Sequence, residues 1–595
     1  MTDSKRTLTA CLLLFAITAL AYAGTWGHGF VNYDDQDTIV NLMLIRDLGD
    51  VSAFFEPVVR RGLPEYMPLK NLSYAIDYAL FGLSPAGFRI QQQLWYGLCV
   101  LLFFFWSRVV LSRIELAAPY VSWLAFAAAA LFALHPSHVE SVTWLSGRKD
   151  VLSGAAMLIA LRCAQLEGAA GLVLALLSTL IALLSKPMAV VLPALFVLQD
   201  WVGAGAPGRS IRGRRTLYAL SLLLCAAFAA FYIDLVGSHR EDANPPPYNS
   251  FAGPAWLRWG QQYLVFLRLA TLPTGLVPRL PASLLDSDLV SLRALAGLLL
   301  LLFLVAGGVY CIRRRSSWLL PLGLFTIPLL PIVASPPWHQ YVGGRYLFLS
   351  VAGVCLAFAI GWAALVRLAP RLQPIATLTL LLIGCCWGAL TLEYNASWRS
   401  GSTLWERAAR VYPDFSELHS LAAGAHVLEG RPDLALRSLS SCLKIDPREP
   451  KCLAAAGELL LPVDPEQGEA MLRTALEHDH KNEVATVLAR HLMRTGRAGE
   501  GLHLYERSLD GTAVKAENLA LLVRLALAAG KETKARHYVR DLVRAAAVNH
   551  PGSPAPIEVV HNVAAELGDA KLAATVEQVA QSCRRSDCFA RGMGW

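Results

Sequence analysis

Long apolar windows recur through the first two thirds of the chain and constrain its fold more than any other feature. A helix that crosses a bilayer needs about 20 largely apolar residues, because only a helix satisfies its own backbone hydrogen bonds inside lipid. Such windows follow one another from Leu8 to Leu392 and then stop. With 55% hydrophobic and 16% charged residues over 595 positions, an ordinary soluble enzyme is excluded. We therefore predict an all-α protein with a polytopic membrane domain.

This membrane domain is predicted to span residues 1–397 and to contain about eleven transmembrane helices. The first window, 8–23, follows Lys5 and Arg6, and we interpret it as a retained helix with a cytoplasmic N-terminus, since no convincing cleavage site follows it. The later windows cover 93–111, 117–134, 150–165, 169–185, 187–201, 216–236, 289–311, 317–334, 346–366 and 373–392. Long outer loops are predicted at 24–92 and 237–288.

Basic clusters support this count, because the cytoplasmic loops of membrane proteins are enriched in Lys and Arg. With eleven spans, the clusters at 108/113, 209–215, 313–315 and 367/371 all fall on the cytoplasmic side. A twelfth span at 256–272 would move the cluster at 313–315 outside, so we expect that segment to be an interfacial amphipathic helix or a re-entrant hairpin. The formal charge of +8 is then explained by membrane orientation, and no nucleic-acid partner is expected.

A soluble helical-repeat domain is predicted at 398–582, followed by a tail at 583–595. An odd number of spans places it on the outer side, opposite the N-terminus. Turns separate amphipathic helical patterns at spacings of 32 to 38 residues, namely at Gly430, Asp464, Gly496, Gly530 and Gly568. This spacing is typical of tetratricopeptide (TPR) repeats, whose stacked helix pairs form an α-solenoid with a concave binding face. A generic helical bundle is the alternative.

Four of the twelve cysteines lie in this second domain or its tail. Cys442 and Cys452 fall on neighbouring predicted helices, and Cys583 and Cys588 are close in the tail. Disulfides are therefore permitted in an oxidising compartment. A zinc site is disfavoured, because the chain contains no CxxC pair.

Adjacent carboxylates directly follow the first span, in the sequence FVNYDDQDTIVN. Asp34 and Asp35 are candidates for a general base, or for ligands of a divalent metal ion if the chemistry requires one. Their place near the membrane surface would let them reach the head group of a lipid-linked substrate. A solvated loop could also carry such a pair, so the pattern alone does not decide its role.

Further polar groups follow several later spans, and the predicted topology places all of them on the outer side. In HPSHVE the polar residues do not share one helical face, so no metal triad is implied. Arg148 and Lys149 form a plausible anion cradle, whereas Lys186 could simply extend to the membrane surface. The candidates for binding the donor phosphate or substrate are His135, His138, Glu140, Arg148, Lys149, Asp150, Lys186 and Arg345.

Several strings occur in one order that resembles a known family: FVNYDDQDTIVN, YMPLKNLSYAIDYALFGL, HPSHVESVTWLSGRKDVLSG, SKPMAVVLPALFVLQDW, GGRYLFLS and SWRSGSTLWERAARVYPD. They are similar to the transmembrane and tetratricopeptide-repeat (TMTC-like) O-mannosyltransferases and their bacterial relatives. The resemblance implies a GT-C fold and a polyprenyl-phosphate sugar donor. It also implies an essential acid in the first outer loop, here Asp34 or Asp35. Arg148, Lys149, Lys186 or Arg345 would then stabilise the phosphate leaving group.

The sequence departs from the family pattern at a few positions. Met67 stands where Arg is usual, and Arg89 and Tyr96 stand where His is frequent. Gly344 replaces a common acidic residue, and Ser350 replaces a common Pro. These differences leave the sugar and the acceptor open, and they allow a diverged or inactive member.

The sequence therefore predicts a membrane glycosyltransferase that moves a hexose such as mannose to a hydroxyl of a protein acceptor. The repeats would bind the acceptor or an envelope partner. The alternative is a catalytically diverged, membrane-anchored TPR scaffold for envelope proteins. A transporter is disfavoured, because the spans carry few paired charges. The usage of Ala, Leu and Arg suggests a bacterial inner membrane protein with a periplasmic repeat domain.

Overall fold

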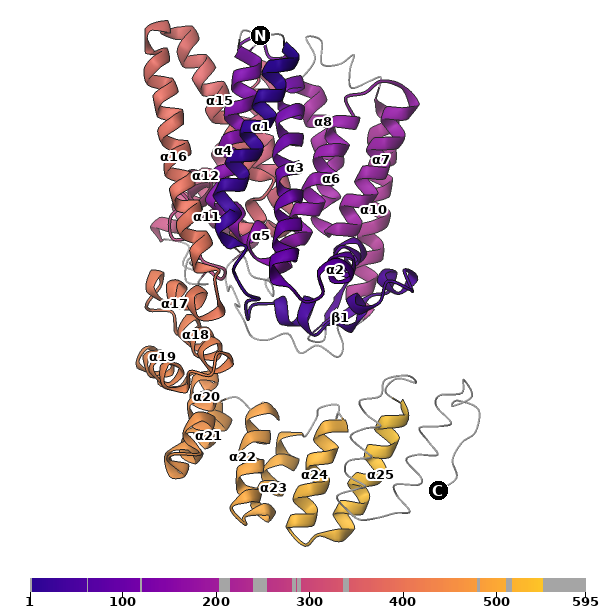
Figure 1. The fold of residues 1–595 in the computed structure, drawn as a ribbon, viewed down its shortest axis with the longest axis vertical. Coiled ribbons are helices and arrows are strands. Elements are labelled where there is room, and N and C mark those ends of the chain that lie inside the picture. Colours follow the sequence, from indigo (N-terminus) through magenta and orange to yellow (C-terminus); the bar gives the residue numbers. More distant parts are fainter. Residues whose placement is uncertain are drawn as a thin grey trace. The chain divides into compact units, whose positions relative to one another are not determined.

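The structure is a computed structural model. It divides into two compact units, Met1–Pro413 and Asp414–Trp595. The structure describes residues 3–60, 63–117, 120–202, 214–238, 254–280, 285, 291–334, 342–478, 482–509 and 516–548. Figure 1 shows its helices and their order along the chain. The predicted tail, the turn at Gly568 and the cysteines Cys583 and Cys588 lie outside the described residues.

The described part of the first unit is helical apart from one short antiparallel hairpin, β1 (Val58–Arg60) with β2 (Leu63–Glu65). Its helices are α1 (Asp3–Tyr22), α2 (Pro68–Phe81), α3 (Pro85–Leu111), α4 (Val121–Leu134), α5 (Val139–Val142), α6 (Arg148–Cys163), α7 (Gly168–Ser185), α8 (Leu192–Val202), α10 (Arg215–Ser238), α11 (Ala255–Thr271), α12 (Leu292–Arg314), α13 (Leu319–Thr326), α14 (Leu330–Val333), α15 (Ser350–Leu368), α16 (Gln373–Ser397) and α17 (Gly401–Val411). The predicted all-α class is confirmed.

Seven helices of the described chain are long and apolar enough to cross a membrane: α1, α3, α7, α10, α12, α15 and α16. The predicted windows 117–134, 187–201 and 317–334 coincide with shorter apolar helices, and 150–165 coincides with the 16-residue α6. The protein is therefore a multi-pass membrane protein, as predicted. The count of eleven spans stays a prediction.

Proline steps interrupt several of these segments for a local reason. The residue before a proline is pushed towards an extended backbone, so a helix usually ends there. His135, before Pro136, ends α4 with ψ 123°, and Lys186, before Pro187, ends α7 with ψ 127°. Both polar residues thereby leave the helices at one end of the first unit.

The two ends of the first unit differ in chemistry. At the N-terminal end of α1, Arg108 near the end of α3 donates to the hydroxyl of Thr7 over 2.8 Å, and Arg214 lies 3.6 Å from Asp200 of α8. The opposite end carries α5 and the loop that contains β1 (Figure 1). Arg108 and Arg214 therefore lie at the end of the first unit opposite to α5, and the predicted orientation in the membrane stays a prediction.

The segment expected in the interface forms α11, which packs along α12 (Figure 1). The two helices cross so closely at Gly260 and Gly297 that an added Cβ on Gly260 would lie 2.5 Å from the Gly297 carbonyl oxygen. Small residues of this kind allow close helix approach in membranes. Gln261 and Gln262 are buried at 1% and 0% exposure, so these polar side chains face protein rather than an open interface.

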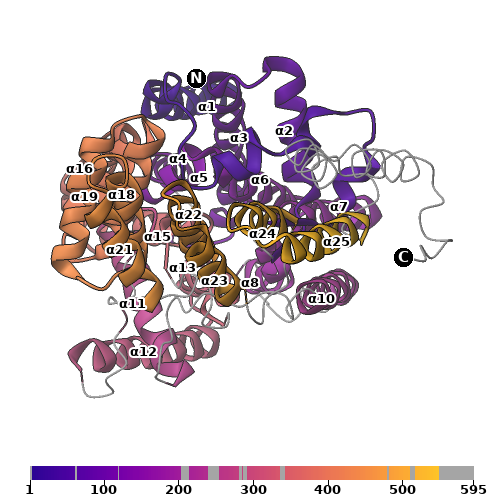
Figure 2. The same ribbon diagram turned by 90° about the horizontal axis from the view of Figure 1, so that it is seen from below.

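The second unit consists of helix pairs in its described part: α18 (Ser416–Leu428) with α19 (Pro432–Ile445), α20 (Pro450–Leu460) with α21 (Pro465–His478), α22 (Asn482–Arg494) with α23 (Ala498–Ser508), and α24 (Ala516–Ala528) with α25 (Glu532–Val548). The last two pairs lie side by side (Figures 1 and 2). Gly430, Gly496 and Gly530 lie in the turns between the two helices of a pair. Their φ angles are near +70°, a backbone conformation that favours glycine. These three turns were predicted, and the TPR-like arrangement is confirmed.

Apolar side chains on the facing helices hold the repeat pairs together. Ala435 of α19 is fully buried, and Ala535 of α25 is 3% exposed. A disulfide joins Cys442 of α19 to Cys452 of α20, as the sequence permitted. α17 packs with the membrane helices, and the first compact unit continues to Pro413. The predicted domain boundary at 397/398 stays a prediction.

Candidate active site

The carboxylate pair after the first span separates into two environments. Asp35 is fully buried, and its oxygens accept hydrogen bonds from Ser146 N (3.1 Å), Ser146 Oγ (2.8 Å) and Val31 N (3.1 Å). Burial raises the pKa of Asp35, and these hydrogen bonds partly offset the increase. Asp34 is only half-buried. Asp35 therefore ties the loop to residues 145–147, while Asp34 is the member of the pair that solvent or a substrate can reach.

Arg148 is buried and makes its contacts within the protein. Its guanidinium forms an ion pair with Asp77 of α2, both side chains being 0% exposed, and donates to the Phe88 carbonyl over 2.7 Å. It also lies over the Tyr74 ring at 4.9 Å. The anion cradle expected from Arg148 and Lys149 is therefore reduced to Lys149, because Arg148 has no exposed atom with which to bind a phosphate.

The two histidines of HPSH are likewise enclosed. His135 Nδ1 accepts from Ser137 N over 3.2 Å, so Nε2 carries the proton and donates to the Ala270 carbonyl of α11 over 3.0 Å. His138 Nε2 lies 3.0 Å from the Phe348 carbonyl, and its Nδ1 lies 2.7 Å from the Tyr96 hydroxyl. Both rings are 0% exposed. Their expected role in binding substrate is not supported by this placement, since they fix α4, α11 and residue 348 together instead.

Two ion pairs lie at the same end of the unit. Arg345 donates to Glu140 Oε1 over 2.5 Å, and its backbone N–H donates to Glu140 Oε2 over 3.1 Å. Lys186 pairs with Asp150, which is 3% exposed. The cations keep more exposure, 11% for the Arg345 side chain and 13% for that of Lys186. Burial raises the pKa of Glu140, and the Arg345 guanidinium partly offsets the increase.

Three cations surround a group of aromatic rings, and together they define the candidate site. Lys149 lies 5.7 Å from the Trp144 ring, Arg345 lies 5.6 Å from that ring, and Lys186 lies 5.5 Å from the Tyr346 ring. Tyr33 connects this group to the acidic loop, since its ring is 4.7 Å from Trp144. Its hydroxyl also accepts from Arg345 over 3.2 Å. Asp34 follows Tyr33 in the chain and is half-buried, so the acidic loop reaches this group through Tyr33.

α17 supports the acidic loop from the C-terminal side of the first unit. Trp405 donates through Nε1 to Asn32 Oδ1 over 3.2 Å, and its ring meets that of Tyr33 edge to face at 5.4 Å. Trp398, just before α17, stacks on Trp144 at 6.2 Å. Residues 398–411, which the sequence analysis assigned to the repeat domain, therefore pack against the candidate site and support it.

The departures from the family pattern have structural consequences. Arg89 is 1% exposed and donates to the carbonyls of His28 (3.1 Å) and Gly29 (2.5 Å), so it fixes the start of the acidic loop. Tyr96 contacts His138. A Cβ at Gly344 would lie 3.0 Å from Glu140 Oε2, so an acidic side chain at this position would meet the Glu140 carboxylate. Nothing in the structure explains Met67 or Ser350.

A divalent metal ion does not fit the carboxylate pair. Both oxygens of Asp35 already accept hydrogen bonds from protein donors, which leaves Asp34 as the one accessible carboxylate of the pair. Within the described ranges, no group of three or more His, Cys, Asp and Glu side chains is arranged to hold a metal ion.

Sequence reasoning did not single out Tyr33, Tyr346 or Trp405 as parts of the site. Tyr33 and Tyr346 each stand next to a residue that was singled out, Asp34 and Arg345, and this adjacency was the available signal. Trp405 lies more than 370 positions from its partner Asn32. No local pattern reveals such a contact.

Fold and site together define a multi-pass helical membrane protein with a cation and aromatic cluster at one end and a TPR-like second unit. The chain is 23% identical to Protein O-mannosyl-transferase TMTC3 of Mus musculus over 481 residues, covering 73% of this chain and 51% of that protein. It is 25% identical to mouse Protein O-mannosyl-transferase TMTC4 over 480 residues, covering 69% and 63%. The predicted resemblance to TMTC proteins is confirmed.

Other comparisons add little. The chain spans about half of TMTC3 and less than two thirds of TMTC4. No family model matches it. The solved structure of pilF from Pseudomonas aeruginosa aligns with 39% of this chain and 96% of its own, at 16% identity and a TM-score of 0.25, a score too low to support a shared fold.

Proposed function

We propose that this protein transfers a hexose, such as mannose, from a polyprenyl-phosphate carrier to a hydroxyl group of a protein acceptor. The observation that carries the proposal is the convergence of Lys149, Lys186 and Arg345 on aromatic rings that contact Tyr33, the neighbour of Asp34 in the acidic loop. The names of the curated relatives, protein O-mannosyl-transferases, support the reaction class.

Lys149 is the central phosphate ligand in this proposal. Lys186 and Arg345 have carboxylate partners, so their charges are largely balanced before a substrate arrives. Among the described residues Lys149 has no carboxylate partner, and its ammonium group lies over the Trp144 ring. A lysine ammonium carries three donors and an arginine guanidinium five, so Lys186 and Arg345 can each retain their pair and still donate to a phosphate oxygen.

Asp34 acts as the general base. The acceptor hydroxyl gives its proton to the Asp34 carboxylate as its oxygen forms a bond to the anomeric carbon. The bond from that carbon to the phosphate oxygen breaks, and the electron pair leaves with polyprenyl phosphate. Fixed cations stabilise the charge that develops on this leaving group, which lowers the barrier to transfer. Because attack comes from the face opposite the phosphate, the anomeric configuration inverts.

The aromatic rings hold the sugar. Tyr33 and Trp144 lie 4.7 Å apart with planes inclined by 31°, between the acidic loop and the cations. Large aromatic faces bury the apolar C–H faces of a sugar ring efficiently. Asp35 is a positioning residue, since its bonds to Ser146 hold the acidic loop against the segment that carries Trp144 and Lys149.

The site faces the non-cytoplasmic side, which is the periplasm if the source is bacterial. Basic residues gather at the opposite end, and such clusters favour the cytoplasm. A disulfide in the second unit fits an oxidising compartment. A reporter fused after Arg315 should read cytoplasmic and one fused after Ser397 should read external, whereas a cytoplasmic signal from the second fusion would contradict this orientation.

The repeats bind the protein acceptor or an envelope partner. A tethered binding surface raises the local concentration of an acceptor segment by ~10²-fold or more where the linker geometry permits. This role requires no reactive group in the second unit.

The test is transfer by the purified full chain. Proteoliposomes that contain the protein would be supplied with radiolabelled polyprenyl-phosphate mannose, or the glucose analogue, and a serine- and threonine-rich peptide. We expect label in the peptide with the wild-type chain and not with Asp34→Asn. No transfer to any hydroxyl acceptor, with donor binding also absent, would favour the diverged scaffold.

A further inference from the structure

A groove opens at the end of the first unit that carries the start of α1, opposite the candidate site. It has a volume of about 330 Å³ and lies between α1, α3 and α4. Its lining residues are Arg6, Thr7, Thr9, Ala10, Leu13, Phe104, Ser122, Trp123 and Phe126. The mechanism proposed above uses none of them.

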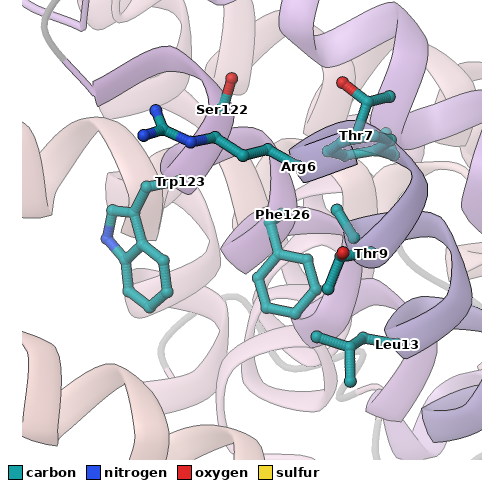
Figure 3. A pocket seen from close by; sticks show the side chains of 9 residues that line it. Arg6, Thr7, Thr9, Leu13, Ser122, Trp123 and Phe126 are labelled. Carbon is teal, nitrogen blue, oxygen red and sulfur yellow. The ribbon is translucent and has the colours of Figure 1, made fainter. Parts of the chain in front are cut away.

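The groove is amphipathic along its length. Figure 3 shows Arg6 extending towards Ser122 and Trp123, while Leu13 and Phe126 lie farther from the guanidinium. Arg6 and Thr7 form a polar rim at the start of α1, and Leu13, one to two turns later, forms part of an apolar wall. Leu12 and Leu13 are 62% and 49% exposed, which identifies this flank as a surface that contacts lipid.

The described residues of the rim carry positive charge. Arg6 is exposed, and within the described ranges its guanidinium makes no hydrogen bond or ion pair. None of the nine lining residues is acidic. A second guanidinium, that of Arg108, reaches the rim by donating to the hydroxyl of Thr7 over 2.8 Å. An occupant with a negative head group is therefore favoured over a neutral one.

Aromatic residues place the groove at the level of the membrane surface. Trp123 of the groove lies 6.4 Å from Trp362, which lies 5.1 Å from Tyr120. Trp and Tyr are enriched where the head groups meet the hydrocarbon, so this cluster marks that level. The Arg6 guanidinium then lies at the depth of a phospholipid phosphate, and the apolar wall lies at the depth of its acyl chain.

We infer that this groove is a binding site for an anionic glycerophospholipid, whose phosphate is held by Arg6 with Thr7 and Ser122 and whose acyl chain packs on Leu13 and Phe126. Arginine suits this role because its planar fork of N–H donors matches a phosphate group. The site is separate from the proposed transfer site and does not depend on the transfer activity.

Trp123 provides a reporter for the test, because bromine atoms on an acyl chain quench a nearby indole. The full chain would be reconstituted in phosphatidylcholine vesicles that contain a minor fraction of brominated phosphatidylglycerol or brominated phosphatidylcholine. The contribution of Trp123 is the difference between the wild-type chain and Trp123→Phe. We expect phosphatidylglycerol to be preferred about fivefold at this groove, the factor for one basic side chain at an anionic surface.

Two variants make the test specific. Arg6→Gln should remove the preference, whereas Lys5→Gln, which removes the neighbouring exposed charge outside the groove, should retain it. Ala10→Phe keeps every charge that orients the helix and fills the groove, so it should abolish quenching of Trp123 by both lipids. Equal quenching by the two lipids in the wild-type chain, or a preference that survives Arg6→Gln, would overturn the inference.

Discussion

Replacing each carboxylate of the acidic pair by its amide separates the two roles assigned to Asp34 and Asp35. The exchange is nearly isosteric, so differences between the variants report on protons and hydrogen bonds rather than on packing. We expect Asp34→Asn to slow transfer strongly while the protein stays folded. We expect Asp35→Asn to destabilise the first unit.

The size of the Asp35→Asn effect follows from its three hydrogen bonds. If the new carbonyl oxygen faces Ser146, which donates from N and Oγ, the new amide NH₂ faces the N–H of Val31. Val31 is 1% exposed, so its N–H loses a partner that water does not replace. A buried unsatisfied donor costs about 1–3 kcal/mol. Because burial raises the pKa of Asp35, loss of its charge offsets part of this cost.

Asp34→Asn should change stability by no more than about 0.5 kcal/mol, as expected for a residue outside the buried network. Its turnover should fall by about 10²–10⁴-fold, the usual contribution of a general base. Apparent thermal midpoints in detergent and initial rates of peptide labelling would be measured for both variants and the wild-type chain. A destabilised Asp34→Asn, or an Asp34→Asn chain with full turnover, would refute the assignment.

Three further predictions concern the cations at 148 and 149, the second unit as a whole, and its disulfide. Arg148→Ala leaves a buried carboxylate without its partner and should destabilise the first unit by about 3–5 kcal/mol, whereas Lys149→Ala should leave the thermal midpoint unchanged and weaken donor binding measured by retention of labelled carrier. Truncation after Pro413 should retain transfer to a short peptide and lose modification of a protein acceptor, so unchanged protein modification would assign the repeats another role. Replacing both Cys442 and Cys452 by Ser should destabilise the second unit by about 2–3 kcal/mol in chemical unfolding, the loop-closure value for a separation of 10 residues, and an unchanged unfolding curve would contradict it.

The sequence predicted what depends on local pattern. Apolar windows located the membrane helices, because a spanning helix must be apolar along its whole length. Glycines at 430, 496 and 530 predicted the repeat turns, since their positive φ is a local requirement.

The sequence could not decide which polar residues serve the fold. Arg148 and Lys149 are neighbours with the same charge, yet one pairs with Asp77 inside the protein and the other remains partly exposed. Their difference depends on α2, which lies about 70 positions earlier in the chain. The contact of Trp405 with Asn32 is likewise a product of tertiary packing. Long-range contacts of this kind also make α17 part of the first compact unit, which ends at Pro413.

Glycan mass spectrometry of exported proteins can show in cells whether this protein transfers hexose to protein hydroxyl groups. Cells that lack the chromosomal gene would express either the wild-type chain or Asp34→Asn at matched levels, and the peptides of their exported proteins would be compared. We predict hexose on Ser or Thr residues with the wild-type chain and its absence with Asp34→Asn. Identical glycosylation in both strains, or no hexose in either, would contradict it.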